Sequence, residues 1–243
     1  MSKKSWDEWV DDEWVQYIAE QYDLDLKEGK ETLKQKKILE AAIHVFAEKG
    51  FSGASTSEIA ERAGVAEATI FKHYRTKKGL LLRLVIPAIA RVASAYIAQP
   101  VLNILDQDKP VEALLREVAI NRKELLEKNW KTIRIILVES LFHPEIREAL
   151  KNHVAKRIIP LVFEKIEEQK QKGKIRADLP NHVILRGVMS QIGAFLFARH
   201  VIPELMAPGG DDEEIDWIVE LLINGIGPRA CSKTESGADK ESH

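Results

Sequence analysis

Cysteine is almost absent from this chain of 243 residues, and several classes of protein are excluded with it. The one cysteine, Cys231, lies in a polar C-terminal stretch, so the chain can form no internal disulfide and suits a reducing compartment. No apolar run approaches the roughly 20 residues that a membrane span needs. The start, MSKKSWDEW, has no apolar core, so we expect no signal peptide. We therefore expect a cytoplasmic protein that does not enter a membrane.

Patterns typical of catalysis and metal binding are also missing. The seven histidines show no metal-binding spacing such as H-E-x-x-H, and Cys231 has no histidine partner within the expected fold. There is no Walker loop and no G-x-G-x-x-G. Glu139 and His143 can share one helix face, but an isolated acid–histidine pair is usually a structural hydrogen bond. We therefore expect no enzyme, no metal site and no cofactor.

Charge is distributed unevenly, although the formal net charge is only −2. Residues 1–33 contain ten acids and four bases, whereas residues 34–78 contain nine bases and five acids. A charge run alone usually marks a solvated surface. Here the basic excess coincides with the motif described next, as a phosphate-binding face requires.

What the chain does contain is a helix-turn-helix pattern between residues 53 and 80. Ser55 stands three residues before a glutamate, the spacing of a capping box, so a helix is expected to begin there. Gly64 is expected to end it, because glycine readily adopts the left-handed conformation of a helix end. A second helix over about residues 66–73 is expected to enter the DNA major groove. Thr76 is expected to cap a third helix.

This stretch resembles the DNA-binding domain of the tetracycline-repressor (TetR) family. The matching residues are Gly50-Phe51, Ser55-Thr56, Ile59-Ala60, Ala63-Gly64-Val65, Thr69-Ile70-Phe71, His73-Tyr74 and Thr76-Lys77. The remainder of the chain matches the family only in its helical layout. The resemblance implies an all-α fold, with an N-terminal three-helix DNA-binding domain and a larger helical domain for ligand binding and dimerisation.

The resemblance also implies which residues contact DNA. Those assigned to phosphate are Thr56, His73 and Lys77, and those assigned to base reading are Ser57, Glu67, Ala68, Thr69 and Lys72. Physically, Lys72 can donate to guanine, Glu67 can accept from cytosine N4, and Ala68 can touch a thymine methyl. An alternative of equal weight is that Glu67 makes no base contact and stabilises the first turn of its own helix. Two positions depart from the family pattern, since Phe71 replaces the usual tyrosine and Ala66 the usual hydroxyl cap.

We expect four segments along the chain. They are an N-terminal extension at 1–32, the DNA-binding domain at 33–78, the ligand-binding and dimerisation domain at 79–226, and a disordered tail at 227–243. The extension carries Trp6, Trp9 and Trp14 at helical spacing within an expected helix over residues 5–22. Such an aromatic stripe is expected to pack on apolar surface, either of its own dimer or of another partner.

In the larger domain the pattern predicts helices and no strands. The expected helices cover about residues 108–129, 130–142, 145–172, 181–202 and 211–226, after a first helix over 33–49 and one that begins at Thr76. Pro87 predicts a kink in that last helix, because proline removes a backbone hydrogen bond. The kink can be a packing feature or a hinge between the domains.

A small apolar or amphipathic effector is expected among these helices, by resemblance to the family. The candidate ligand contacts are Asn121, Trp130, Ile133, Arg134, Leu137, Val138 and Phe142, each of which can equally well fill a core. The penultimate helix is apolar on nearly every side, so one side is expected to meet a second subunit. The expected dimer-interface residues are Gly187, Ser190, Ala194, Phe195, Ala198, Trp217 and Leu221.

These observations predict a homodimeric transcriptional regulator. We expect a repressor that a small ligand releases from a palindromic operator in double-stranded DNA. The alternative is a protein-interaction adaptor that uses DNA binding only to localise itself, with the N-terminal aromatic stripe as its docking element.

Overall fold

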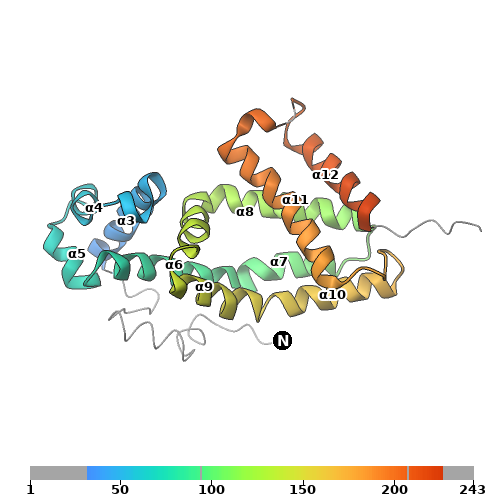
Figure 1. Cartoon of the computed structure of the whole chain (residues 1–243), viewed down its shortest axis with the longest axis horizontal. Helices are drawn as coiled ribbons and strands as arrows, with labels where there is room; N and C mark the ends of the chain where they lie inside the picture. Colours follow the sequence, from blue (N-terminus) through green and yellow to red (C-terminus); the bar gives the residue numbers. More distant parts are fainter. Residues whose placement is uncertain (1–31, 94, 207, 227–243) are drawn as a thin grey trace, which may run out of the picture.

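A computed structural model describes residues 32–93, 95–206 and 208–226, and their regular secondary structure is entirely helical (Figure 1). The all-α class is thereby confirmed. The elements are α3 (Leu33–Gly53), α4 (Thr56–Ala63), α5 (Glu67–Tyr74), α6 (Lys77–Ala93), α7 (Ala95–Leu105), α8 (Val111–Ser140), α9 (Pro144–Ala149), the π-helix η1 (Leu150–Ala155), α10 (Ile159–Gln171), α11 (Asn181–Val201), the 3₁₀-helix η2 (Pro203–Leu205) and α12 (Asp211–Ile226). The expected aromatic helix over residues 5–22 and the expected tail over 227–243 lie outside the described residues. Among the helices that the structure describes, none has both the length and the apolar character to cross a bilayer.

The first described helix begins and breaks where the sequence indicates. Thr32 and Gln35 form a reciprocal capping box, in which each backbone N–H donates to the other residue's side-chain oxygen, at 2.8 and 3.3 Å. Gly50 adopts φ 70°, ψ 172° and interrupts the helical path, as expected. The helix resumes for one turn to Gly53, which the pattern did not predict.

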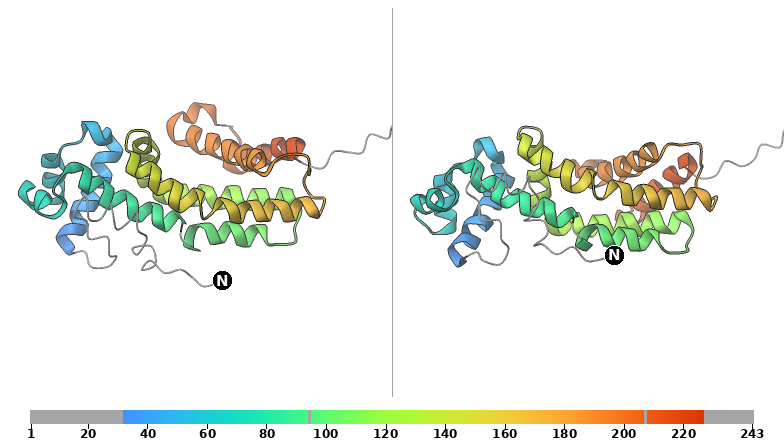
Figure 2. Two further views of the ribbon diagram at one scale, coloured as in Figure 1. Left: turned by 60° about the horizontal axis from the view of Figure 1, so that its bottom comes forward. Right: turned by 90° about the horizontal axis from the view of Figure 1, so that it is seen from below.

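The buried side chains form two cores. The first unites α3 to α6 with the last turns of α8 and with α9, through Ile135, Ile136 and Ile146. The second joins the first half of α8 to α11 and α12. In the left view of Figure 2, α11 and α12 lie on one side of α7, α8 and α10. Because α8 has 30 residues, it extends about 45 Å and reaches both cores.

Two helix boundaries differ from the expectation. The break expected between Asn129 and Trp130 is absent, since α8 is continuous there, and the side-chain amide of Asn129 donates to the carbonyl of Leu125 at 2.8 Å. The long helix expected over 145–172 is divided into α9, η1 and α10, since Pro160 at the start of α10 cannot donate a helical hydrogen bond. The last two helices lie within a residue of their expected bounds.

Helix α6 belongs structurally to the DNA-binding end of the molecule. Its side chains from Leu80 to Ile89 are buried in the first core, and α6 continues through Pro87. The three preceding helices alone would make too small a core to be stable, so they need this support. The domain boundary at residue 78 remains a prediction, and the packing crosses it.

Candidate functional site

The helix-turn-helix is built by local backbone bonds at the predicted residues. Ser55 caps α4, because its hydroxyl accepts from the Glu58 N–H at 3.1 Å. Gly64 ends α4 in the left-handed conformation, at φ 67°, ψ 38°. The N–H of Val65 then donates to the Ala60 carbonyl at 3.0 Å, which closes the tight turn before α5.

The start of α5 is held by a contact that the sequence did not reveal. Ala66, at the cap position, has no side-chain oxygen. Instead the Thr56 hydroxyl donates to Glu67 Oε1 at 2.6 Å and links the first turns of α4 and α5. The residue expected to bind phosphate and the residue expected to read bases therefore bind each other in the free protein.

The residues predicted to read bases lie together on one outward face. Ser57, Glu67, Ala68 and Lys72 are exposed and Thr69 is half-buried. The other side of the same two helices is buried through Ile59, Ala60, Ala63, Ile70 and Tyr74. An outward set of short polar and basic side chains on rigidly anchored helices is what major-groove reading requires.

A strained turn sets the angle at which α5 meets α6. Arg75 has φ 57° and ψ −42°, and the N–H of Thr76 donates to the Tyr74 carbonyl at 2.6 Å, which is the bonding pattern of a γ-turn. That carbonyl would lie 2.2 Å from a Cβ at Gly79, so only glycine fits there. Thr76 caps α6 as predicted and accepts from the Gly79 N–H at 2.9 Å. A glycine in the first turn of a helix was the signal that could have revealed this close approach.

The Lys77 side chain points into the protein. Its ammonium donates to the carbonyls of Phe51 and Ala54, at 2.7 and 2.9 Å, and lies 4.5 Å from the centre of the Phe51 ring. An ammonium has three donors, so one remains for a phosphate. His73, the other basic residue assigned to phosphate, is half-buried beside Tyr74.

The predicted ligand contacts do not line one cavity. Leu137, Val138 and Phe142 are exposed, the last at 72%, as is Arg134, so the expectation that these residues enclose a ligand within one subunit is corrected. On the continuous α8, Arg134, Leu137 and Val138 share the face opposite the buried Ile135, Ile136 and Glu139, and Phe142 follows the end of the helix. Asn121, Trp130 and Ile133 are half-buried, and Trp130 stacks on His200 with ring centres 4.1 Å apart.

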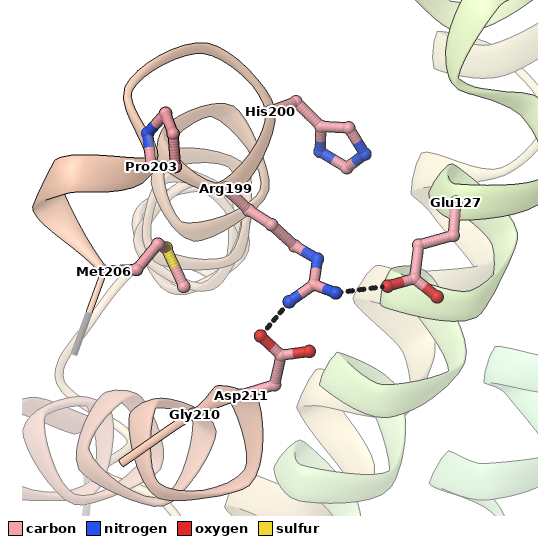
Figure 3. Close-up of a pocket in the computed structure, with 7 residues that line it drawn as sticks. All are labelled: Glu127, Arg199, His200, Pro203, Met206, Gly210 and Asp211. Carbon is pink, nitrogen blue, oxygen red and sulfur yellow. Dashed lines mark hydrogen bonds and ion pairs between the residues drawn. The ribbon is translucent and has the colours of Figure 1, made fainter. Parts of the chain in front are cut away.

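A hollow of about 470 Å³ lies between α8, the end of α11 and the start of α12 (Figure 3). Its lining residues are Glu127, Arg199, His200, Pro203, Met206, Gly210 and Asp211. Arg199 points between two carboxylates and forms ion pairs with Asp211 and, at 3.0 Å, with Glu127. Lys123 lies 2.5 Å from the second oxygen of Asp211. The hollow is thus a polar junction that ties α11 and α12 to α8, and it differs from the apolar cavity that the sequence suggested.

The outer face of α11 and α12 exposes most of the residues predicted for dimerisation. Ser190, Ala194, Trp217 and Leu221 are exposed, the last two at 48% and 64%. Gly187 and Ala198 are half-buried at its edge. Sequence reasoning missed the large exposed side chains beside them, Met189 and Phe197.

Phe195 does not lie on this face, so the prediction that it belongs to the dimer interface is wrong. It is 4% exposed and packs in the second core of its own subunit. A helix that is apolar on nearly every side carries no periodic signal, so its inner and outer faces cannot be separated from the sequence.

Comparison with known proteins agrees with this geometry. Residues 38–84 match the model of a family described as bacterial regulatory proteins, tetR family. The HTH-type transcriptional repressor AcnR of Corynebacterium diphtheriae is 24% identical over 197 residues, which are 80% of this chain and 92% of AcnR.

Solved structures show the same fold at low sequence identity. The regulator FadR from Bacillus subtilis, in complex with stearoyl-CoA, has a TM-score of 0.57 at 21% identity, covering 79% of this chain and 98% of FadR. The ketosteroid transcriptional regulator KstR2 of Mycobacterium tuberculosis has a TM-score of 0.59 at 16% identity, covering 83% of this chain and 98% of KstR2.

Proposed function

We propose that the chain is a member of the tetR family of bacterial regulatory proteins and acts as a dimeric repressor that a small ligand releases from operator DNA. The observation that carries this proposal is the outward face of α4 and α5, where Ser57, Ala68 and Lys72 are exposed on helices anchored by Ile59 and Ile70. The name of AcnR supports repression as the direction of control. A protein that acts on operator DNA works in the bacterial cytoplasm, which is the location we propose.

On DNA, α5 lies in the major groove and the residues divide the work by chemistry. Lys72 donates to guanine and Ala68 contacts a thymine methyl, while Thr56, His73 and Lys77 hold phosphates. A phosphate at Thr56 competes with Glu67 for the hydroxyl, so binding frees the Glu67 carboxylate to accept from cytosine N4. The exposed Lys34, Lys36 and Lys37 at the start of α3 add long-range attraction to the backbone.

Two subunits pair through the outer face of α11 and α12. Trp217, Leu221, Met189 and Phe197 supply the exposed apolar area that a stable interface needs. A two-fold axis then presents two recognition helices to half-sites about one helical turn, roughly 34 Å, apart. The operator is therefore palindromic.

The effector is an apolar or amphipathic molecule bound within the helical domain. Support comes from FadR, which is in complex with stearoyl-CoA, and from KstR2, which is named a ketosteroid transcriptional regulator. A long acyl chain and a steroid share a large apolar surface, and burying such a surface supplies most of the binding free energy.

The test is selection from random DNA by the full-length protein. We expect enrichment of a palindrome, and Lys72→Ala should cost about 1–3 kcal/mol per half-site with relaxed preference at one guanine. Lys128→Ala, which removes an exposed lysine from α8, is the matched control. Titration of the complex with stearoyl-CoA and with a ketosteroid then asks whether either releases the DNA. Absence of any enriched sequence would contradict the proposed function.

A further inference from the structure

The corner where α8 meets α9 holds a buried carboxylate that the proposed function does not use. Glu139 is only 5% exposed. It lies in the last turn of α8, where a negative charge opposes the helix dipole. A buried polar group costs free energy unless it is hydrogen-bonded, so the Glu139 side chain requires a specific partner.

That partner is the backbone of the DNA-binding domain. The break at Gly50 leaves the N–H of Phe51 without a helical acceptor. Glu139 Oε1 accepts from this N–H at 2.9 Å, across 88 residues of sequence. A Cβ at Gly50 would lie 3.9 Å from the same oxygen, so the carboxylate rests directly against the broken helix.

Phe51 is held from two further directions. Lys77 of α6 donates to the Phe51 carbonyl and covers one side of its ring. His143, which precedes α9, lies edge-on to the ring with centres 4.8 Å apart, and its Nε2 is 3.4 Å from Glu139 Oε2. Thus the N–H, the carbonyl and the ring of Phe51 are each bound by a different segment of the chain.

Phe51 lies in the last turn of α3, five residues before α4 begins at Thr56, so its placement fixes the segment that leads into the helix-turn-helix. We propose that Glu139 is the positioning residue that orients the helix-turn-helix on the helical domain, and this rests on the proposed function. The middle of α8 carries the ion pairs of Lys123 with α12 and of Glu127 with α11. One continuous helix therefore connects the proposed dimer layer to the carboxylate that holds Phe51. Removing Glu139 lets the two recognition helices of a dimer vary in separation, and a palindrome of fixed spacing is then bound poorly.

The experiment compares Glu139→Ala and Glu139→Gln in the full-length protein. Glutamine keeps an oxygen that accepts from Phe51, so it should rescue what alanine loses. Glu148→Ala is the control, because it removes an acid that pairs at the surface with Lys151. A spin label is attached to the cysteine of Glu61→Cys in a Cys231→Ser background. Pulsed electron paramagnetic resonance then measures the distance between the labels on the two DNA-binding domains of a dimer. Binding is measured to the selected operator and to random DNA at one salt concentration.

For Glu139→Ala we expect a broader distribution of distances between the two labels and about tenfold weaker operator binding. Binding to random DNA should stay within about twofold of the parent, because charge-driven binding does not depend on the spacing of the two recognition helices. Exchange of the Phe51 amide hydrogen should rise at least about tenfold. An unchanged distribution together with an unchanged ratio of operator to random-DNA affinity overturns the proposal. A purely stabilising role would lower the melting temperature and leave that ratio unchanged at matched folded fraction.

A further variant and the two measurements that need no operator allow the test to decide even if Glu139→Ala fails to fold or no operator is found. If Glu139→Ala does not fold, Glu139→Asp replaces it, since a side chain one methylene shorter keeps the charge but cannot reach Phe51. Loss of orientation in Asp and its retention in Gln support the proposal, and the reverse overturns it. If the parent protein selects no DNA sequence, the proposed function fails, whereas the distances and the Phe51 exchange still decide the role of Glu139.

Discussion

The two cores of this molecule differ in how completely a single subunit closes them. Of the eleven large side chains that the structure describes as fully buried, nine lie in the first core, around α3 to α6. The exceptions are Leu114 and Ile215. Most of the second core retains some solvent contact, and its outer helices expose Trp217 and Leu221. The DNA-binding end therefore buries its core within one chain, whereas the other end leaves apolar side chains exposed on α11 and α12, the face at which we propose that a second copy packs.

This difference follows from the task of each region. Reading bases requires side chains held at fixed positions, and such positions depend on tightly packed anchors such as Ile59 and Ile70. A region that pairs with a second subunit must keep apolar surface outside until the subunits meet. The four predictions below test this contrast, starting with the largest expected effect.

Core truncation should cost more in the first core than in the second. Ile38→Ala removes a fully buried side chain from α3, and we expect a loss of about 2–5 kcal/mol in the free energy of unfolding. Ile218→Ala makes the same change in the second core, where residual exposure allows relaxation, and should cost less. Urea unfolding at one protein concentration measures both. An equal or larger loss for Ile218→Ala would contradict the contrast.

A charge on the outer face of α12 should separate the subunits. Leu221→Glu places a carboxylate on the face that we propose is buried between two copies, and we expect a loss of about 2–4 kcal/mol in dimerisation free energy. Sedimentation equilibrium should show monomers at micromolar concentration. Leu141→Glu makes the same change at the exposed leucine that follows α8 and serves as the control. A Leu221→Glu variant that remains dimeric would place the interface elsewhere.

Two glycines should respond in opposite directions. Gly79→Ala forces a methyl group against the Tyr74 carbonyl, and we expect a loss of about 1–3 kcal/mol in stability with weaker DNA binding. A methyl group at Gly193 of α11 meets open space within the subunit, so Gly193→Ala should gain up to about 1 kcal/mol from helix propensity. Thermal unfolding of both variants is the measurement. Stabilisation by Gly79→Ala would show that the γ-turn does not persist in solution.

Acidification should weaken the joint at Phe51 slightly. Burial lowers the pKa of His143 below its ordinary value of 6.5, the Glu139 carboxylate opposes this shift, and Lys78 adds to it. Between the lowered pKa and about 6.5, His143 binds more protons in the unfolded chain than in the folded protein. Its contribution to the free energy of unfolding is therefore complete above about pH 6.5 and is lost as the pH falls towards the lowered pKa. His143→Gln should reduce the dependence of the melting temperature on pH between pH 7 and 5.5. His182→Gln, at an exposed position of α11, is the control. An unchanged slope in His143→Gln would exclude this contribution.

Local signals in the sequence were sufficient for the DNA-binding helices. The caps at Ser55 and Thr76, the left-handed Gly64 and the break at Gly50 are all in the structure, because each acts through hydrogen bonds within a few residues. The outward residues of α4 and α5 were assigned through the resemblance to the tetR family. The bounds of α11 and α12 were predictable for the same reason.

Tertiary packing decided the features in which distant segments meet. No local rule places the Lys77 ammonium on Phe51 or the Glu139 carboxylate on the Phe51 N–H, because these partners are 26 and 88 residues apart. The inward turn of Phe195 and the outward face of Leu137 also depended on which neighbours cover each helix. The sequence alone therefore predicted the all-helical class and the helix-turn-helix through caps, glycines and short-range spacing, and it predicted the residues of the proposed DNA-reading face through the resemblance to the tetR family. Only the tertiary structure decided how that face is attached to the rest of the protein, because long-range contacts form once the helices have packed.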